Sequence, residues 1–313
     1  MRHLLLFLLV ACGGDSKGDS GAVEATDAGD ADADADADTD SDTDTDTDSD
    51  ADADTDSDAD TDSDTDSDTD TDTDTDPTVD FDRRCDPLPI APDTIDVSPA
   101  DAGNLQSIVN GLNPGDTLRF APGTYPLGGQ YLWVDAAGVS LVGATGDPAD
   151  VVLDGEYSST EILTIAASDV TAQGLTFARA YTHGVHVVGG ADGDITGTRL
   201  HRITVIDPGQ QAIKINQAVT GLGNTYPDDG EVSCSTLQLT EAGRPFIRDG
   251  CYTGGIDSHR SRGWHIRDNH VEGFWCDTGL SEHGIHLWRQ NQHTLIERNT
   301  VVDCARGIGV GLV

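Results

Sequence analysis

The sequence predicts an all-β solenoid in the C-terminal two-thirds of the chain. Short aliphatic segments bounded by Gly, Asp and Asn follow one another there, which is typical of β-strands. Segments of the form small–apolar–x–apolar recur, and so does the pattern Ile-x-x-Asn-x-Val. The repeats lie 30 residues apart from Ile266 to Ile296 and 23 apart from Gly284 to Gly307. Such periods, with several short strands in each, indicate coils that stack on their neighbours.

A single amphipathic helix is predicted at the start of this region, over 104–112. Its apolar residues Leu105, Ile108, Val109 and Leu112 have the i, i+3, i+4, i+7 spacing of a helix with one buried face. Turn residues follow, and after them we expect a series of short strands that includes 117–120, 139–143, 151–155, 162–166 and 184–188. Each strand should bury alternate aliphatic residues in a shared core.

These features together resemble right-handed parallel β-helix proteins of the pectate-lyase-like superfamily. The resemblance rests on the opening helix, the segment NPGDTLRFAPGTY at 113–125 and the later coils, and it covers about residues 100–313. It implies that the helix caps the N-terminal end of the coil stack. It implies no particular activity, because this architecture hosts lyases, hydrolases, epimerases and adhesins. We expect a β-helix domain over 81–313, truncated at its C-terminal end because the sequence stops within an apparent strand at 308–313.

The first twelve residues have the features of an export signal. Arg2 and His3 precede the apolar run Leu4–Val10, and the sequence LVAC at 9–12 resembles the lipobox of bacterial lipoproteins. The resemblance implies that 1–12 is a lipoprotein signal peptide and that Cys12 is lipidated. It also implies anchoring to the bacterial outer membrane, with exposure at the cell surface. The alternative is a short secretory signal with an incidental Cys.

The charge of the chain is concentrated in one segment. The sequence has 57 acidic and 17 basic residues, a net charge of −40, and every even position from Asp30 to Asp76 is Asp. These 24 carboxylates leave −40 + 24 = −16 for the rest. Because so acidic a segment has almost no apolar surface to bury, we predict a disordered Asp-rich linker over 13–80. The acidic balance also argues against nucleic acid as a partner, and no apolar stretch is long enough for a transmembrane helix.

The recurring strands predict a column of polar side chains. If the coils stack in register, the outward residues of the small–apolar–x–apolar segments align as His186, Lys214, Asp257 and His286. An acid, a base and a cation along such a face could act on a bound sugar chain. The alternative is that these residues are polar only because the outer face of a solenoid is solvated.

The region 244–306 contains eight Arg and eight acidic residues, together with three of the four Trp. Arg can bind carboxylates with two hydrogen bonds, and we expect the indole rings to stack on sugars, although Trp264 alternates with Ile266 and could fill the core. The candidate catalytic residues are Asp257, His259, His283, His286 and Arg306, in which Asp257 or a His would be a general base and Arg306 would neutralise a uronate. The candidate substrate-binding residues are His186, Lys214, Arg260, Trp288 and Arg298.

Structural roles explain other polar residues better. Asn269 and Asn299 occupy equivalent places in successive coils, where Asn tolerates left-handed backbone and could form a ladder of amides. His283 and His286 could be two zinc ligands, but no third ligand is apparent, so we predict no metal site. We predict no cofactor either, with calcium as the one ion left open.

Exported cysteines are expected to pair. The separation of 28 residues between Cys276 and Cys304 is about one coil, so these two could bridge neighbouring coils. Cys234 and Cys251 could close the irregular insertion at 217–250, which would leave Cys85 without a partner.

The sequence therefore predicts a lipid-anchored surface protein that binds or processes a polysaccharide, with the glycan and the membrane as its partners. A lyase-like or hydrolase-like site is one interpretation, and whether the protein is an enzyme stays open. The alternative is a noncatalytic adhesin or scaffold module. The paired-Asp motifs of polygalacturonase-like hydrolases and the acidic calcium triad of pectate lyases are not evident.

Overall fold

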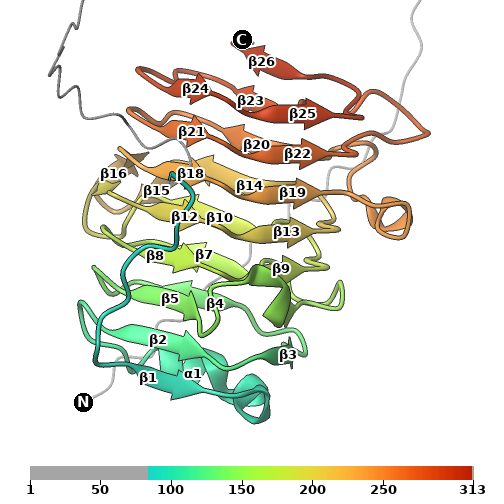
Figure 1. Cartoon of the computed structure of the whole chain (residues 1–313). Helices are drawn as coiled ribbons and strands as arrows, with labels where there is room; N and C mark the ends of the chain where they lie inside the picture. Colours follow the sequence, from blue (N-terminus) through green and yellow to red (C-terminus); the bar gives the residue numbers. More distant parts are fainter. Residues whose placement is uncertain (1–83, 312–313) are drawn as a thin grey trace, which may run out of the picture. The chain divides into compact units, whose positions relative to one another are not determined.

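The computed structural model describes residues 84–311, and within this range the chain forms a parallel β-helix (Figure 1). The predicted signal peptide, Cys12 and the whole of the predicted linker lie outside the described residues. Three parallel sheets, A, B and C, run along the stack, and each successive coil adds one strand to each of them. In Figure 1 the strands of sheets A and B run one way across the stack and those of sheet C return. The all-β solenoid predicted from the sequence is confirmed.

Seven coils, numbered 1 to 7 from the N-terminal end, carry the three sheets. Sheet A contains β1 (Ile95–Val97), β2 (Thr117–Phe120), β5 (Ser140–Gly143), β8 (Thr171–Gln173), β12 (Arg199–His201), β18 (Glu231–Ser233), β21 (His265–Arg267) and β24 (Leu295–Glu297), of which β1 precedes coil 1. Sheet B contains β3 (Gly123–Pro126), β6 (Val151–Asp154), β9 (Thr176–Ala178), β13 (Thr204–Ile206), β19 (Thr236–Gln238), β22 (His270–Glu272) and β25 (Thr300–Val302). Sheet C contains β4 (Leu132–Val134), β7 (Leu163–Ile165), β10 (Val185–Val188), β14 (Gln211–Asn216), β20 (Gly254–Ser258), β23 (Ile285–Leu287) and β26 (Ile308–Val310).

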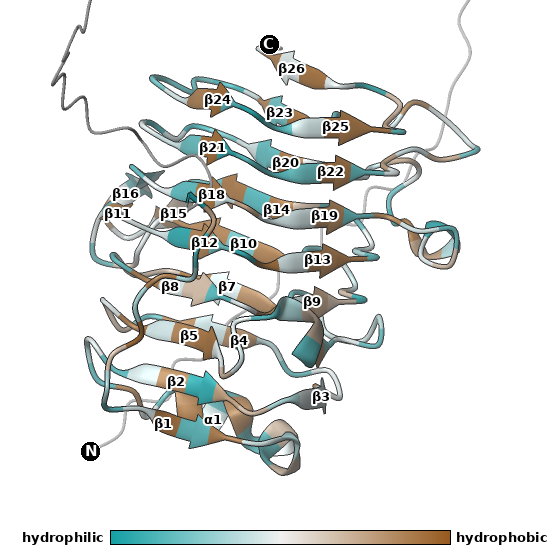
Figure 2. Ribbon diagram, viewed as in Figure 1, coloured by the Kyte–Doolittle hydropathy of each residue, from teal (hydrophilic) through white to brown (hydrophobic). Residues whose placement is uncertain are grey.

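The core consists of aliphatic columns that run through the coils. In sheet A the central inward residue is apolar in every coil, and hydrophobic residues recur at matching places in successive strands (Figure 2). Ile266 pairs with Ile296 in register, as the 30-residue repeat predicts. Trp264 is 1% exposed and donates its indole N–H to the carbonyl of Pro227 at 2.8 Å, so this Trp belongs to the core.

A short helical segment covers the first coil. It comprises the 3-10 helix η2 (Pro99–Asn104) and the helix α1 (Leu105–Val109), which contacts β4. Leu105, Val109 and Leu112 are buried, so the predicted amphipathic face is confirmed, although regular α-helix ends at Val109. The remaining helical turns are η3 (Pro148–Asp150) and η4 (Arg244–Phe246), and within 84–311 no helix has the length and apolarity to cross a bilayer.

The turn from sheet A to sheet B has two residues in coils 3 to 7. Its first residue is left-handed in each coil, including Asp268 (φ 56°) and Arg298 (φ 54°). The second residue is Asn269 or Asn299 in the last two coils, and the Nδ2 of Asn269 donates to the Oδ1 of Asn299 at 2.9 Å. The predicted amide ladder is therefore present, but the left-handed backbone belongs to the residue before each Asn.

The disulfides differ from the predicted pairs. Cys85 pairs with Cys234 and Cys251 pairs with Cys276, while Cys304 is free. The 30-residue register of coils 6 and 7 ends with sheet B, because the turn 273–284 of coil 6 is longer than the turn 303–307 of coil 7, so Cys276 and Cys304 do not occupy equivalent places. Cys276 instead lies in an extended turn beside the turn that carries Cys251.

The pairing of Cys234 depends on a segment that we call the strap, residues 84–94. The strap runs along the outside of sheet A from coil 5 down to β1 (Figure 1). The backbone of Leu88 exchanges two hydrogen bonds of 2.9 Å with the side-chain amide of Gln173, and Nη1 of Arg202 donates to the carbonyl of Cys85 at 2.7 Å. The strap therefore crosses several coils and holds them together from outside.

Candidate functional site

The outer face of sheet C carries the column of polar side chains that the sequence predicts. Strand pairing places one residue of each coil in register, in the order Trp133, Thr164, His186, Lys214, Asp257, His286 and Gly309. The four predicted members of the column therefore lie on adjacent strands. The arrangement follows because successive side chains of a strand point alternately to the core and to the outer face of the sheet.

The centre of the column lies between the longest turns of the solenoid. The turn 217–230, from sheet C to sheet A, includes the hairpin of β15 (Ala218–Thr220) and β16 (Gly223–Thr225). Its strand β17 (Pro227–Asp228) pairs with β11 (Ile195–Thr196) of the coil before. The turn 239–253 enters β20 from sheet B, on the other side of sheet C. Both turns flank coils 4 and 5, where Lys214 and Asp257 lie.

Lys214 and Asp257 form a buried ion pair. The Nζ of Lys214 contacts the Oδ2 of Asp257, and the side chains are 8% and 1% exposed. Burial alone raises the pKa of Asp257, but hydrogen bonding from His259 and the charge of Lys214 outweigh burial and lower this pKa to about 2. Asp257 is therefore a carboxylate at neutral pH and fixes the lysine in one position.

Two further proton-carrying groups surround the lysine. The hydroxyl of Tyr252 and the Nε2 of His259 each lie 3.1 Å from the Nζ of Lys214. The Nε2 of His259 also lies 3.1 and 3.2 Å from the two carboxylate oxygens of Asp257. Burial raises the pKa of Tyr252, so its phenol is protonated at neutral pH. Both groups are only partly buried and can meet a ligand on this face.

Aromatic rings continue this site toward coil 6. Trp288 stacks on His259 with ring centroids 5.4 Å apart, and His286 meets the edge of Trp288 at 4.8 Å. His286 is fully buried, which prevents direct contact with a ligand, whereas His283 and Trp288 are partly exposed. The Nδ1 of His286 lies 3.2 Å from a carboxylate oxygen of Glu282.

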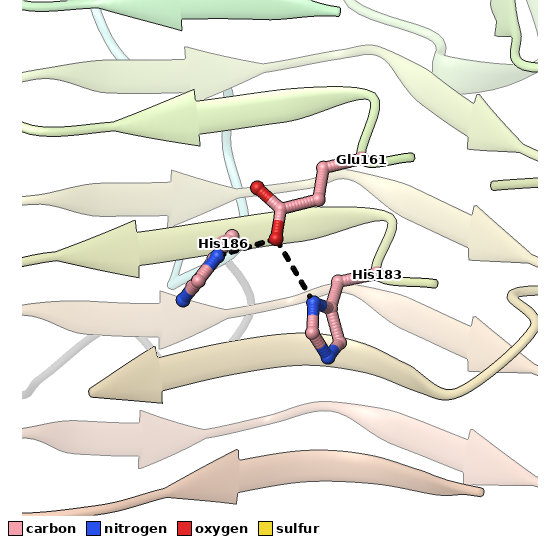
Figure 3. Close-up of side chains that lie close together, drawn as sticks. All are labelled: Glu161, His183 and His186. Carbon is pink, nitrogen blue, oxygen red and sulfur yellow. Dashed lines mark hydrogen bonds and ion pairs between the residues drawn. The ribbon is translucent and has the colours of Figure 1, made fainter. Parts of the chain in front are cut away.

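A second polar cluster lies toward coil 3, where the carboxylate of Glu161 stands between two imidazoles (Figure 3). Its Oε1 lies 3.1 Å from the Nδ1 of His183 and 2.5 Å from the Nδ1 of His186. Burial raises the pKa of Glu161, but the adjacent imidazoles of His183 and His186 outweigh it, and the net shift is downward. Glu161 is therefore ionised at neutral pH.

Three predicted site residues are not brought into contact with the centre of the column. Arg298 lies in the turn from sheet A to sheet B and pairs with Asp268 at 2.7 Å, so it is on another side of the solenoid. Arg260 lies in the turn after β20 and lines a separate cavity of about 370 Å³ with Arg262 and Tyr226. Arg306 is nearer, because its charge helps lower the pKa of His283 after the larger effect of burial.

The site also contains residues that the sequence analysis did not single out. Tyr252 lies in an irregular turn, and no pattern in the sequence marks it. Glu161 and His183 could have been found, because HGVH at 183–186 and HGIH at 283–286 repeat one motif. Among residues 84–311, two groups of side chains offer three ligand atoms within 4.8 Å of one another: Glu161, His183 and His186, and Glu282, His283 and His286. The expectation that no third ligand accompanies His283 and His286 is therefore wrong.

Comparison with known proteins gives no match to a family model and none among curated sequences. Among solved structures, the chain is similar to the pectate lyase Pel9A, with 14% identity and a TM-score of 0.49 over 66% of this chain and 55% of that one. It is also similar to an alginate lyase from Paenibacillus sp. str. FPU-7, with 12% identity and a TM-score of 0.48 over 67% of this chain and 76% of that one. The chain thus spans 55% of the length of Pel9A.

Proposed function

We propose that the outer face of sheet C binds an acidic polysaccharide and cleaves it by β-elimination. The observation that carries this proposal is the group of Lys214, Tyr252 and His259, in which two proton-carrying side chains lie 3.1 Å from a buried lysine. Elimination next to a uronate requires a base for the carbon-bound proton, an acid for the leaving oxygen and a positive charge near the carboxylate. These three residues supply all three requirements.

The hydrogen bonds assign a role to each group. We place the proton of neutral His259 on Nε2, next to the carboxylate of Asp257, so that the other ring nitrogen keeps its lone pair and serves as the base. Tyr252 holds its proton at neutral pH and serves as the acid. Lys214 provides the positive charge, and Asp257 fixes its position. The partly exposed ring of Trp288 supplies a surface on which a sugar can stack.

Hydrolysis fits this site less well. A glycosidase requires two carboxyl groups, one of which is protonated before the reaction. Asp257 is 1% exposed and its pKa is about 2, so it neither reaches a glycosidic oxygen nor carries a proton at neutral pH. We therefore favour elimination over hydrolysis.

The test is to incubate the full chain with polygalacturonate, alginate and other uronate polymers and to follow the ultraviolet absorbance of the unsaturated product. Tyr252→Phe and His259→Ala should each lower the rate about 100-fold or more, because each removes a proton-transfer group. His270→Ala is the matched control, since His270 lies on sheet B and pairs with Glu272. Full activity in both site variants would refute the assigned roles.

A noncatalytic binding module is the second candidate. The ring of Trp288 and the adjacent imidazoles could hold a glycan without acting on it. Retention on immobilised polysaccharide, abolished by Trp288→Ala and without any product, would favour this candidate over the lyase.

We also propose that the protein is anchored through a lipid on Cys12, with the Asp-rich segment as a spacer. The motif LVAC at 9–12 supports this localisation. Metabolic labelling with a fatty-acid analogue tests it, and unchanged labelling of Cys12→Ser would contradict it.

A further inference from the structure

We propose that Glu161, His183 and His186 form a binding site for a zinc-class divalent cation on sheet C, with a fourth coordination position open to solvent. The proposal does not depend on the lyase activity. It rests on the geometry of the three ligand atoms, on the side chains that orient them and on the kind of atoms they are.

The three ligand atoms converge on one point. Oε1 of Glu161 lies 3.1 Å from the Nδ1 of His183 and 2.5 Å from the Nδ1 of His186 (Figure 3). All three atoms lie within 4.8 Å of one another. Ligands of a tetrahedral zinc with bonds of about 2.0 Å are separated by about 3.3 Å. Movements of less than about 1 Å, within the reach of side-chain rotation, would therefore open the group around an ion.

Each ligand is held by an outer hydrogen bond on the side away from this point. Nε2–H of His186 donates to the Oδ1 of Asn216 at 2.7 Å, and Nε2–H of His183 donates to the Oε1 of Gln211 at 3.1 Å. The hydroxyl of Thr164 donates to the second carboxylate oxygen of Glu161 at 2.6 Å. Metal-binding His and carboxylate side chains usually have such partners, which fix the tautomer and leave the ligand lone pairs directed inward.

This arrangement favours a cation over an empty centre. With both Nε2 atoms donating outward to amide oxygens, both Nδ1 lone pairs face Oε1 of Glu161. A bound divalent ion removes the repulsion among the three atoms.

The ligand set selects the class of ion. Two imidazole nitrogens and one carboxylate oxygen suit zinc and similar transition metals, whereas calcium takes six to eight oxygen ligands. Three protein ligands leave a position free, and the ligand side chains are 12 to 17% exposed, so solvent can reach it. His186 pairs in register with Lys214, which places the ion one strand away from the proposed reaction centre.

The group of Glu282, His283 and His286 is the natural comparison, because it has the same ligand types. His286 is fully buried there, and neither of its ring nitrogens has a hydrogen-bond partner. His286 therefore lacks a hydrogen-bond partner like Asn216 or Gln211, which orient the imidazoles of His186 and His183. For this reason we assign the zinc site to Glu161, His183 and His186.

The test is zinc binding by the full chain after treatment with a chelator. Titration against a chromophoric zinc indicator is performed in excess magnesium, because magnesium occupies the linker carboxylates without competing for imidazole. We expect about one tightly bound zinc per chain, and we expect cobalt to give the visible spectrum of a tetrahedral site. Circular dichroism of each variant shows whether the solenoid remains folded.

Glu161→Gln and His183→Ala should each weaken zinc binding about 100-fold or more, and Asn216→Ala about 10-fold. His283→Ala is the matched control and should leave the affinity unchanged. Absence of tight zinc binding in the folded wild-type chain would overturn the proposal. So would unchanged affinity in folded Glu161→Gln, or loss of binding in His283→Ala alone.

Discussion

Replacing Lys214 with Met tests the central ion pair directly. The substitution keeps the volume of the side chain but leaves the carboxylate of Asp257, which is 1% exposed, without its cation. Removing one partner of a buried pair costs about 3–5 kcal/mol. The Nε2 of His259 remains 3.1 Å from Asp257, so we expect the lower end of this range, about 3 kcal/mol. The double variant Lys214→Met with Asp257→Leu should recover most of the loss, because an apolar pair needs no compensation.

The pair also predicts how stability depends on pH. The pKa of Asp257 falls from its ordinary value of 3.8 to about 2 in the folded protein, and a change of this size corresponds to about 2 kcal/mol. Because the folded pKa is depressed, this contribution is complete above about pH 4 and is lost as the pH falls through about 2. In Lys214→Met the positive charge that offsets burial is gone, so the pKa of Asp257 should be lowered less. The loss of stability between about pH 4 and pH 2 should therefore be smaller than in the wild-type protein.

Chemical unfolding followed by tryptophan fluorescence measures these free energies. The matched control is Arg119→Met, which removes an exposed ion pair with Asp96 and should leave stability nearly unchanged. A loss below about 1 kcal/mol for Lys214→Met would refute the reasoning, as would a double variant whose loss equals the sum of the single losses.

Two further predictions concern the crosslinks and the amide ladder. Replacing Cys85 and Cys234 with Ser removes a bond that spans 149 residues and should cost about 5 kcal/mol, against about 3.5 kcal/mol for Cys251 and Cys276, which are 25 residues apart. Urea unfolding measures both, and the reverse order would contradict the loop-closure explanation. Asn269→Ala should cost about 1–3 kcal/mol, because the side chain is buried and accepts the backbone N–H of the neighbouring coil at 3.0 Å. A loss within experimental error in the same urea measurement would show that the ladder contributes nothing.

The repeat pattern allows the sheet register to be predicted, because residues on a pleated strand alternate strictly between core and solvent. For this reason the sequence alone places Lys214 and Asp257 on adjacent strands, as the structure has them. The turns between sheets have no such period. Tyr252 and Glu161 lie in turns, and their positions relative to the column depend on the path of each turn through space.

The disulfide pairs were predicted wrongly for the same reason, because the turns have no regular period. Counting residues between cysteines assumes that the chain between them follows a regular coil, which fails for Cys276 in its extended turn. The strap shows more clearly what the repeat pattern cannot predict, because Cys85 lies in a segment that belongs to no coil and still pairs with Cys234. The sequence carries no repeat from which that contact could be read.

The strap also determines how mechanical tension would pass through the protein. The described chain begins at Arg84, whose guanidinium lies 4.0 Å from Asp268 of coil 6, and the next residue is covalently joined to Cys234 of coil 5. Lys214 belongs to coil 4, the coil before Cys234. A pull between Arg84 and a ligand at Lys214 therefore travels through the disulfide and about one coil, and the first three coils carry none of the load. Reduction of this one bond would redirect the same pull through β1 and the whole N-terminal half of the stack.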